Sequence, residues 1–162
     1  MAISIINGLV KISEALQSLK NKKLDTRVFN AVIHNTYTVV PTSEIKYSSG
    51  FSSNGGNVIL MGNLIRPYIY PKVTTALGDG NITDKQICTF TIDDDRITYI
   101  PPTFPMMTAS TGGVIHGLFR TSSTSSPWSC SVDITYTHAD VAKDSSFALM
   151  AAIPISIDVT KY

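Results

Sequence analysis

Apolar residues recur near the N-terminus at alternating steps of three and four. The series is Ala2, Ile5, Leu9, Ile12, Leu16 and Leu19. This spacing is the a/d seam of a coiled coil, and polar residues such as Ser13, Glu14 and Gln17 take the outward positions. The pattern predicts an amphipathic helix that ends at Lys23 and is about 28 Å long.

The apolar seam of this helix requires a covering surface, and two arrangements would supply one. A lone helix of this length is marginal in water, so it either lies on the sheet of its own chain or bundles with helices of other copies. Leu9 at a with Ile12 at d favours three or four strands over two. We therefore expect a homotrimer, held together by Ile5, Leu9, Ile12, Leu16 and Leu19.

After Asp25 the hydrophobic period changes from 3.6 to 2, which indicates β-strands. Strand candidates are residues 28–33, 37–40, 57–61, 64–70, 86–92, 96–100, 114–120, 128–137 and 147–159. Eight or nine short strands separated by turn signals predict an antiparallel β-sandwich or jelly roll. The chain is thus expected to be mainly β, with an N-terminal helix for oligomerisation and attachment (1–25) and a sandwich domain (26–162).

The strand expected over 128–137 has the clearest alternation. One face carries Trp128, Cys130, Val132, Ile134 and Tyr136, whereas the other carries serine, threonine and Asp133. Cys88 likewise shares a face with Phe90 and Ile92. Both cysteines should therefore face the core as free thiols, although a disulfide remains open because it depends on the distance between the strands.

Charged residues are scarce in this chain. They make up 15% of it, against about 25% in an average domain, and the net charge is +1. This balance disfavours disorder and nucleic-acid binding. The basic cluster Lys20, Lys22, Lys23 and Arg27 is explained by the C-terminal end of the predicted helix, where cations are stabilised by its dipole.

Neither export nor membrane insertion is expected. Residues 1–8 lack the basic start of a signal peptide, and Asn7 and Gly8 interrupt their apolar run. The most apolar stretch, 147–157, is about half the length of a membrane-spanning helix and contains Pro154.

The sequence carries no recognisable catalytic or metal-binding motif. His34, His116 and His138 are dispersed, and the run of aspartates at 93–95 suits a tight hairpin turn. Glutamate occurs only at Glu14 and Glu44, so no carboxylate pair for glycoside hydrolysis stands out. We expect a protein that is not an enzyme and has no metal or cofactor.

Three loops, at residues 47–57, 77–84 and 121–128, are rich in hydroxyls, glycine or asparagine, and the first and third also carry isolated aromatic residues. Such mixtures serve recognition surfaces, and aromatic faces with amide partners suit sugar rings. The alternative is that these loops are simple solvated connections, and Trp128 also suits the start of a core strand. The candidate contact residues are Tyr47, Phe51, Asn54, Asn57, Ser125 and Trp128.

The layout of the whole chain carries a resemblance. A heptad helix (ISIINGLVKISEALQSLKNKK) that runs straight into a Ser/Thr-rich sandwich without an export signal resembles the small trimeric fibre and receptor-binding proteins of tailed bacteriophages. The resemblance implies a virion protein made in the host cytoplasm. Its helix would bind other virion proteins, and its sandwich would contact host-surface saccharide. A head fibre or a capsid- or tail-decorating protein fits the size equally well.

Two other classes share parts of this layout. Trimeric ligands that resemble the tumour-necrosis-factor or complement globular-head jelly rolls are normally exported, whereas we expect no export for this chain. A carbohydrate-binding module would be monomeric. Oligomeric mass therefore separates the virion interpretation from a monomeric module.

Overall fold

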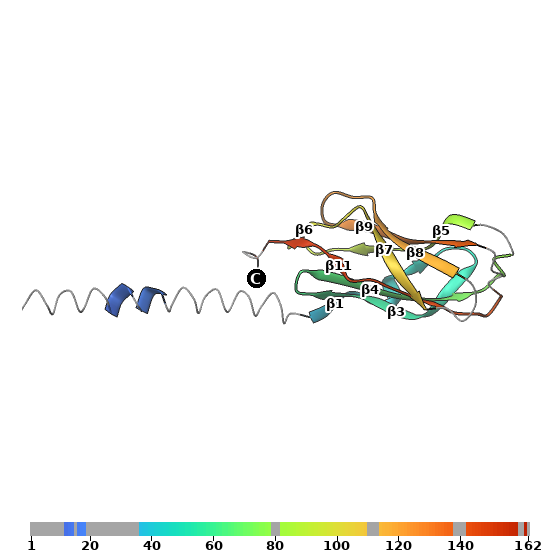
Figure 1. The fold of residues 1–162 in the computed structure, drawn as a ribbon, viewed down its shortest axis with the longest axis horizontal. Coiled ribbons are helices and arrows are strands. Elements are labelled where there is room, and N and C mark those ends of the chain that lie inside the picture. Colours follow the sequence, from blue (N-terminus) through green and yellow to red (C-terminus); the bar gives the residue numbers. More distant parts are fainter. Residues whose placement is uncertain are drawn as a thin grey trace, which may run out of the picture.

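A computed structural model describes residues 12–14, 16–18, 36–78, 82–109, 114–137, 142–158 and 161. Residues 12–14 and 16–18 are helical and stand clear of the β domain (Figure 1). Ile12 and Leu16 are 58% and 61% exposed, so these two seam residues are not covered by the sheet of their own chain. The other expected oligomerisation residues, Ile5, Leu9 and Leu19, lie outside the described residues, and the helical bundle stays a prediction.

The described part of the chain is mainly β, as the sequence predicts. A short 3-10 helix, η1, spans Thr42–Glu44. The strands are β1 (Thr36–Val40), β2 (Lys46–Tyr47), β3 (Phe51–Met61), β4 (Leu64–Val73), β5 (Ile82–Ile92), β6 (Ile97–Tyr99), β7 (Thr103–Ala109), β8 (Val114–Thr121), β9 (Trp128–Thr137), β10 (Ala148–Met150), β11 (Ile153–Pro154) and β12 (Ser156–Ile157).

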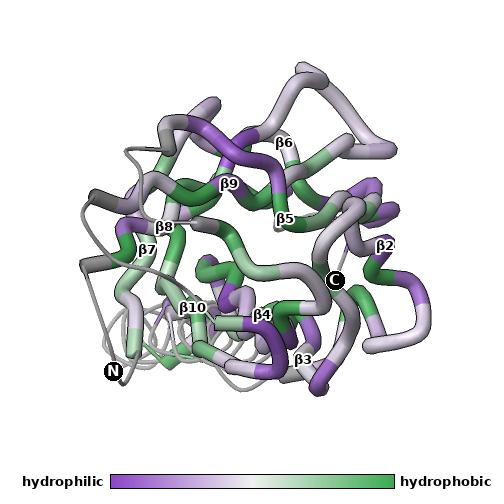
Figure 2. The backbone as a smooth tube through the Cα atoms, turned by 90° about the vertical axis from the view of Figure 1, so that its right-hand side faces the viewer, coloured by the Kyte–Doolittle hydropathy of each residue, from purple (hydrophilic) through white to green (hydrophobic). Residues whose placement is uncertain are grey.

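One large antiparallel sheet contains all of these strands except β6 and β12, which pair with each other. Its order is β1-β3-β4-β10-β7-β8-β9-β5-β2, with β11 paired to β4. The sheet curls, so that β3, β4 and β10 lie on one side of the domain and β9 and β5 on the other (Figure 2). This curvature encloses the core and is compatible with a sandwich or jelly roll.

The alternation of β9 is confirmed. Its side chains from Trp128 to Tyr136 on the apolar face are all buried, at 4% exposure or less. Phe119, Leu60 and Leu149, from strands on both sides of the curl, fill the same core. Burial of apolar surface is therefore what closes the sheet.

Both cysteines are buried free thiols, as expected. Cys88 is paired in register with Val132, and Cys130 with Phe90. The two cysteines are therefore diagonal neighbours on adjacent strands rather than a directly opposed pair.

Three expectations about the elements need correction. Much of the loop expected over 47–57 belongs to β3, whose register shifts at Ser53–Gly56. The strand expected over 147–159 is three short strands, β10, β11 and β12, because the pairing is interrupted at Ala151–Ala152 and at Ile155. The aspartates at 93–95 form a turn but not a hairpin, because β6 pairs with β12 rather than β5.

In the described part of the chain, no helix has the length and hydropathy needed to cross a bilayer.

Candidate binding groove

A hydroxyl-rich groove of about 920 Å³ lies on the outer face of β5, β8 and β9. It is lined by Ser43, Glu44, Lys46, Gln86, Thr89, Phe90, Thr91, Pro102, Thr103, Arg120, Thr121, Ser122, Ser129, Cys130 and Ser131. Phe90 and Cys130 are buried on the core face. Hydroxyl-bearing serine and threonine therefore dominate the exposed lining.

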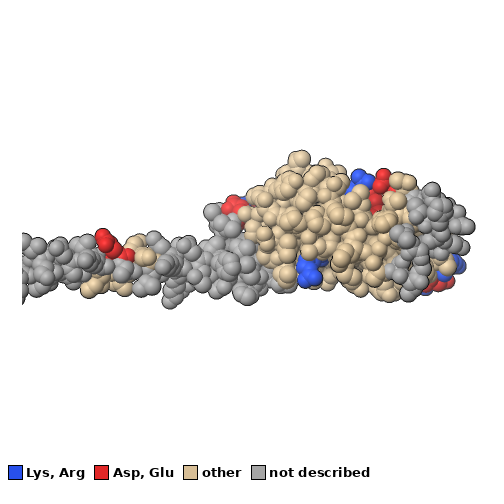
Figure 3. Space-filling model, in the orientation of Figure 1, with Lys and Arg blue, Asp and Glu red and all other residues tan. Residues whose placement is uncertain are grey.

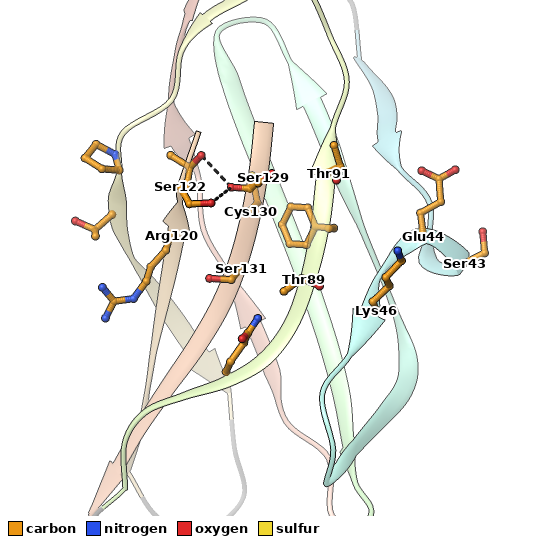
Figure 4. A pocket seen from close by; sticks show the side chains of 15 residues that line it. Ser43, Glu44, Lys46, Thr89, Thr91, Arg120, Ser122, Ser129, Cys130 and Ser131 are labelled. Atoms are coloured by element: carbon orange, nitrogen blue, oxygen red, sulfur yellow. Dashed lines mark hydrogen bonds between the residues drawn. The ribbon is translucent and has the colours of Figure 1, made fainter. Parts of the chain in front are cut away.

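Strand register explains why these residues meet. Lys46 pairs with Thr89, Thr89 with Ser131, Ser131 with Arg120, and Arg120 with Thr103. Residues opposite one another in a sheet share a face, so these five form a continuous row across β2, β5, β9, β8 and β7. We call it the polar row. Figure 4 shows Ser131 and Thr89 between Arg120 on one side and Lys46 on the other.

Arg120 is the most constrained polar group of the groove. Its Nε donates to Asp133 Oδ2 at 2.6 Å, and its Nη2 donates to Asp84 Oδ1 at 2.9 Å. Hydrogen bonding to Asp133 raises the pKa of Arg120. Asp133 is 7% exposed although it is on the polar face of β9, and the guanidinium supplies the counter-charge that its burial requires.

The rim formed by residues 121–128 is tied to β9 by hydrogen bonds. Thr121 Oγ1 and Ser122 Oγ donate to the carbonyl of Ser129 at 3.2 and 3.5 Å (Figure 4), and the Ser129 amide donates to Ser123 Oγ at 2.8 Å. These bonds give the rim a defined conformation. Ligand binding there would cost little conformational entropy, because the rim is already ordered.

The opposite rim comes from η1 and β2. Ser43, Glu44 and Lys46 are all exposed there. Thr42 Oγ1 donates to the carbonyl of Gly56, which anchors η1 to β3. Glu44 and Lys46 bring opposite charges, so this rim adds hydrogen-bonding capacity with little net charge.

The lining is rich in groups that form hydrogen bonds. Among its described lining residues there is one carboxylate, Glu44, and no histidine that could act as a base for the serines. Among the described residues, no group of three or more His, Cys, Asp or Glu side chains is placed to hold a metal ion. Clustered hydroxyls with an amide and a guanidinium match the hydroxyl groups of a saccharide.

The structure does not gather the six expected contact residues into one site. Asn54 and Ser125 are exposed, and Asn54 Nδ2 donates to Ser146 Oγ at 3.3 Å. Tyr47 is half-buried, its hydroxyl donates to the Gly55 carbonyl at 3.2 Å, and burial raises its pKa to about 12.

Phe51 and Trp128 are core residues rather than surface contacts, at 6% and 2% exposure. Each is the first residue of a strand, β3 or β9, and its ring points into the core. Asn57 is half-buried and lines a different, apolar groove.

The polar row could not be read from any one segment of the sequence. Its residues come from five strands and meet only through the register of the sheet. The outward serines and threonines of β9 were the available signal, because a polar face on a half-buried strand is exposed by definition. The composition of the loops instead predicted contact residues in the loops and not on that face.

Comparison of the chain with protein-family models, with curated proteins and with solved structures finds no match. The candidate site therefore rests on its own geometry.

Proposed function

We propose that the chain is a trimeric virion protein of a tailed bacteriophage, of the fibre or receptor-binding type, whose groove binds host-surface saccharide without chemical turnover. The observation that carries the binding proposal is the groove lining, with its row of hydroxyls beside Arg120 and Gln86. The bacteriophage assignment rests on the resemblance in layout.

A trimer would compensate for weak ligand binding by each single groove. Hydroxyl-mediated contacts are individually weak because each replaces hydrogen bonds to water. Three grooves on one particle act through effective concentration, which raises avidity by about 10²-fold or more. The exposed Ile12 and Leu16 support the helix as the part that brings the copies together. Its N-terminal end would also bind other virion proteins.

A large side chain placed in the groove tests whether the groove binds saccharide. Thr89→Tyr places a ring in the centre of the polar row and keeps a residue that strands tolerate well. We expect the full-length protein to bind an array of bacterial surface polysaccharides, and the variant to lose about tenfold or more of that binding. Thr98→Tyr, at an exposed position of β6 outside the groove, is the matched control and should bind like wild type.

Equal binding by the Thr89→Tyr and Thr98→Tyr proteins would remove the groove as the saccharide site. If the wild-type protein binds no polysaccharide on the array and adsorbs to no candidate host cell, receptor recognition is contradicted. The alternative would then take its place, a head fibre or a tail-decorating protein that binds other virion proteins.

A further inference from the structure

A second groove, of about 450 Å³, lies on the outer face of β3, β4, β7 and β10 and is apolar. Its lining is Asn57, Ile59, Met61, Arg66, Pro67, Tyr68, Met107, Met150, Ala151 and Ala152. Among the described residues of this lining, Arg66 alone is charged. The visible surface of the β domain is similarly poor in charge (Figure 3).

Strand register again builds a row, here of apolar side chains. Tyr68 pairs with Met150, and Met150 pairs with Met107, so the three lie side by side across β4, β10 and β7. Tyr68 is 41% exposed and Met107 is 70% exposed. Exposed apolar side chains that adjoin one another mark an interaction surface more often than scattered ones do. We call these three residues the apolar row.

The apolar groove is continuous with the end of the sheet that the N-terminal segment joins. Met61, at one end of the lining, is paired in register with Thr36, the first residue of β1. The helical residues 12–14 and 16–18 lie beyond this end, in line with the β1, β3 and β4 side of the domain (Figure 1). Copies joined through that helix would therefore bring their apolar sides closest together.

We propose that the apolar row is the contact surface for a second copy of this chain, so that the β domains as well as the helices pack together in the oligomer. This rests on the proposed trimer. Methionine side chains adapt to a neighbouring surface because they are flexible and polarizable. The polar row shares none of these residues and would stay free for a ligand.

Methionine oxidation in the full-length protein tests the proposal directly. Met107 and Met106 are neighbours in β7, yet Met106 is 6% exposed and provides an internal reference. In the oligomer we expect hydrogen peroxide to oxidise Met107 about as slowly as Met106. In a Leu16→Asp variant that no longer assembles, Met107 should react several-fold faster than Met106, because its thioether is then uncovered.

A pair of tyrosine variants gives a second measurement. Tyr68→Asp places a charge in the apolar row, whereas Tyr99→Asp changes a 52% exposed tyrosine of β6 outside it. Light scattering at graded dilution should show that Tyr68→Asp raises the dissociation concentration by about tenfold or more. Tyr99→Asp should leave it close to the wild-type value.

The outcomes separate this inference from the proposed function. An oligomer whose Met107 reacts as fast as in the Leu16→Asp monomer overturns the apolar contact and leaves the trimer standing. An oligomer that survives Leu16→Asp with Met107 still protected supports the apolar contact and contradicts the helical seam. A wild-type monomer overturns both, whereas loss of saccharide binding alone bears only on the polar groove.

Discussion

Gly55 and Gly56 are consecutive residues of β3 with the same φ of +120°, yet their surroundings differ. A Cβ atom on Gly56 would lie 2.5 Å from the Tyr68 carbonyl oxygen, whereas a Cβ atom on Gly55 would meet nothing within 4 Å. The bulge thus lets β3 approach β4 at a point where only hydrogen fits.

Alanine substitution of each of these two glycines gives a matched test of the close approach to β4. Gly55→Ala should lower the free energy of unfolding by about 1 kcal/mol through backbone strain alone. Gly56→Ala should lower it by about 3 kcal/mol, because strain is joined by a collision with backbone atoms that cannot move aside. Urea denaturation measures both, and equal losses would show that the close approach to β4 is not tight.

The buried thiols make the free energy of unfolding fall at alkaline pH. Burial raises the pKa of Cys88 and of Cys130 from 9.0 to about 12. The two thiols contribute fully to the free energy of unfolding below pH 9, which is their pKa in the unfolded chain. This contribution is lost as pH rises towards 12, because the unfolded chain releases these protons first. Each thiol should remove about 1.4 kcal/mol per pH unit in that range.

Cys130→Ala should therefore have a shallower loss of stability between pH 9 and 11 than wild type, even though the smaller side chain lowers stability at every pH. Denaturant midpoints across this pH series give the comparison. Identical slopes for the two proteins would mean that the thiol is not shielded from solvent.

At the scale of elements, the edge strand β1 is fastened by side chains as well as by pairing. The Tyr37 hydroxyl donates to the carboxylate of Asp94, and Arg96 donates to the same carboxylate at 2.9 and 2.8 Å. Burial raises the pKa of Asp94, while the Arg96 amide works in the opposite direction. The Arg96 guanidinium also lies 4.9 Å from the centre of the Tyr37 ring. This cluster joins β1 to the turn between β5 and β6.

Tyr37→Phe should therefore loosen β1 specifically. We expect faster amide hydrogen exchange in β1 and a global loss of about 1 kcal/mol, since one hydrogen bond to a buried carboxylate is removed. Tyr99→Phe, on an exposed ring of β6, is the control and should change neither quantity. Unchanged exchange in β1 would place its anchoring in the β1–β3 ladder alone.

The sequence best predicts the elements that have one buried face, because burial of one face sets the periodicity of their apolar residues. β9 is half-buried, so its alternation is strict and its core face was identified residue by residue. β7 was missed because Pro105 and the adjacent Met106 and Met107 break the usual strand pattern. The polar row was missed for a different reason, since it depends on register between strands distant in sequence, and register is fixed only when the whole sheet closes.

At the scale of the whole molecule, the curled sheet has two chemically different outer faces. Hydroxyls and Arg120 occupy the face over β5, β8 and β9, and the apolar row occupies the face over β4, β7 and β10. The helical residues lie in line with the β1, β3 and β4 side of the domain (Figure 1). This division would direct self-association and ligand binding to separate surfaces, so that one does not obstruct the other.

We expect the chain to assemble into a trimer through the helical seam, and the mass of the full-length protein in solution measures this assembly. Multi-angle light scattering at micromolar concentration should give three times the chain mass of 17.6 kDa. Leu16→Asp should lower that mass while circular dichroism retains the strand signal, and Ser13→Asp, on the outward face of the helix, should not. A wild-type mass of 17.6 kDa would contradict trimer assembly.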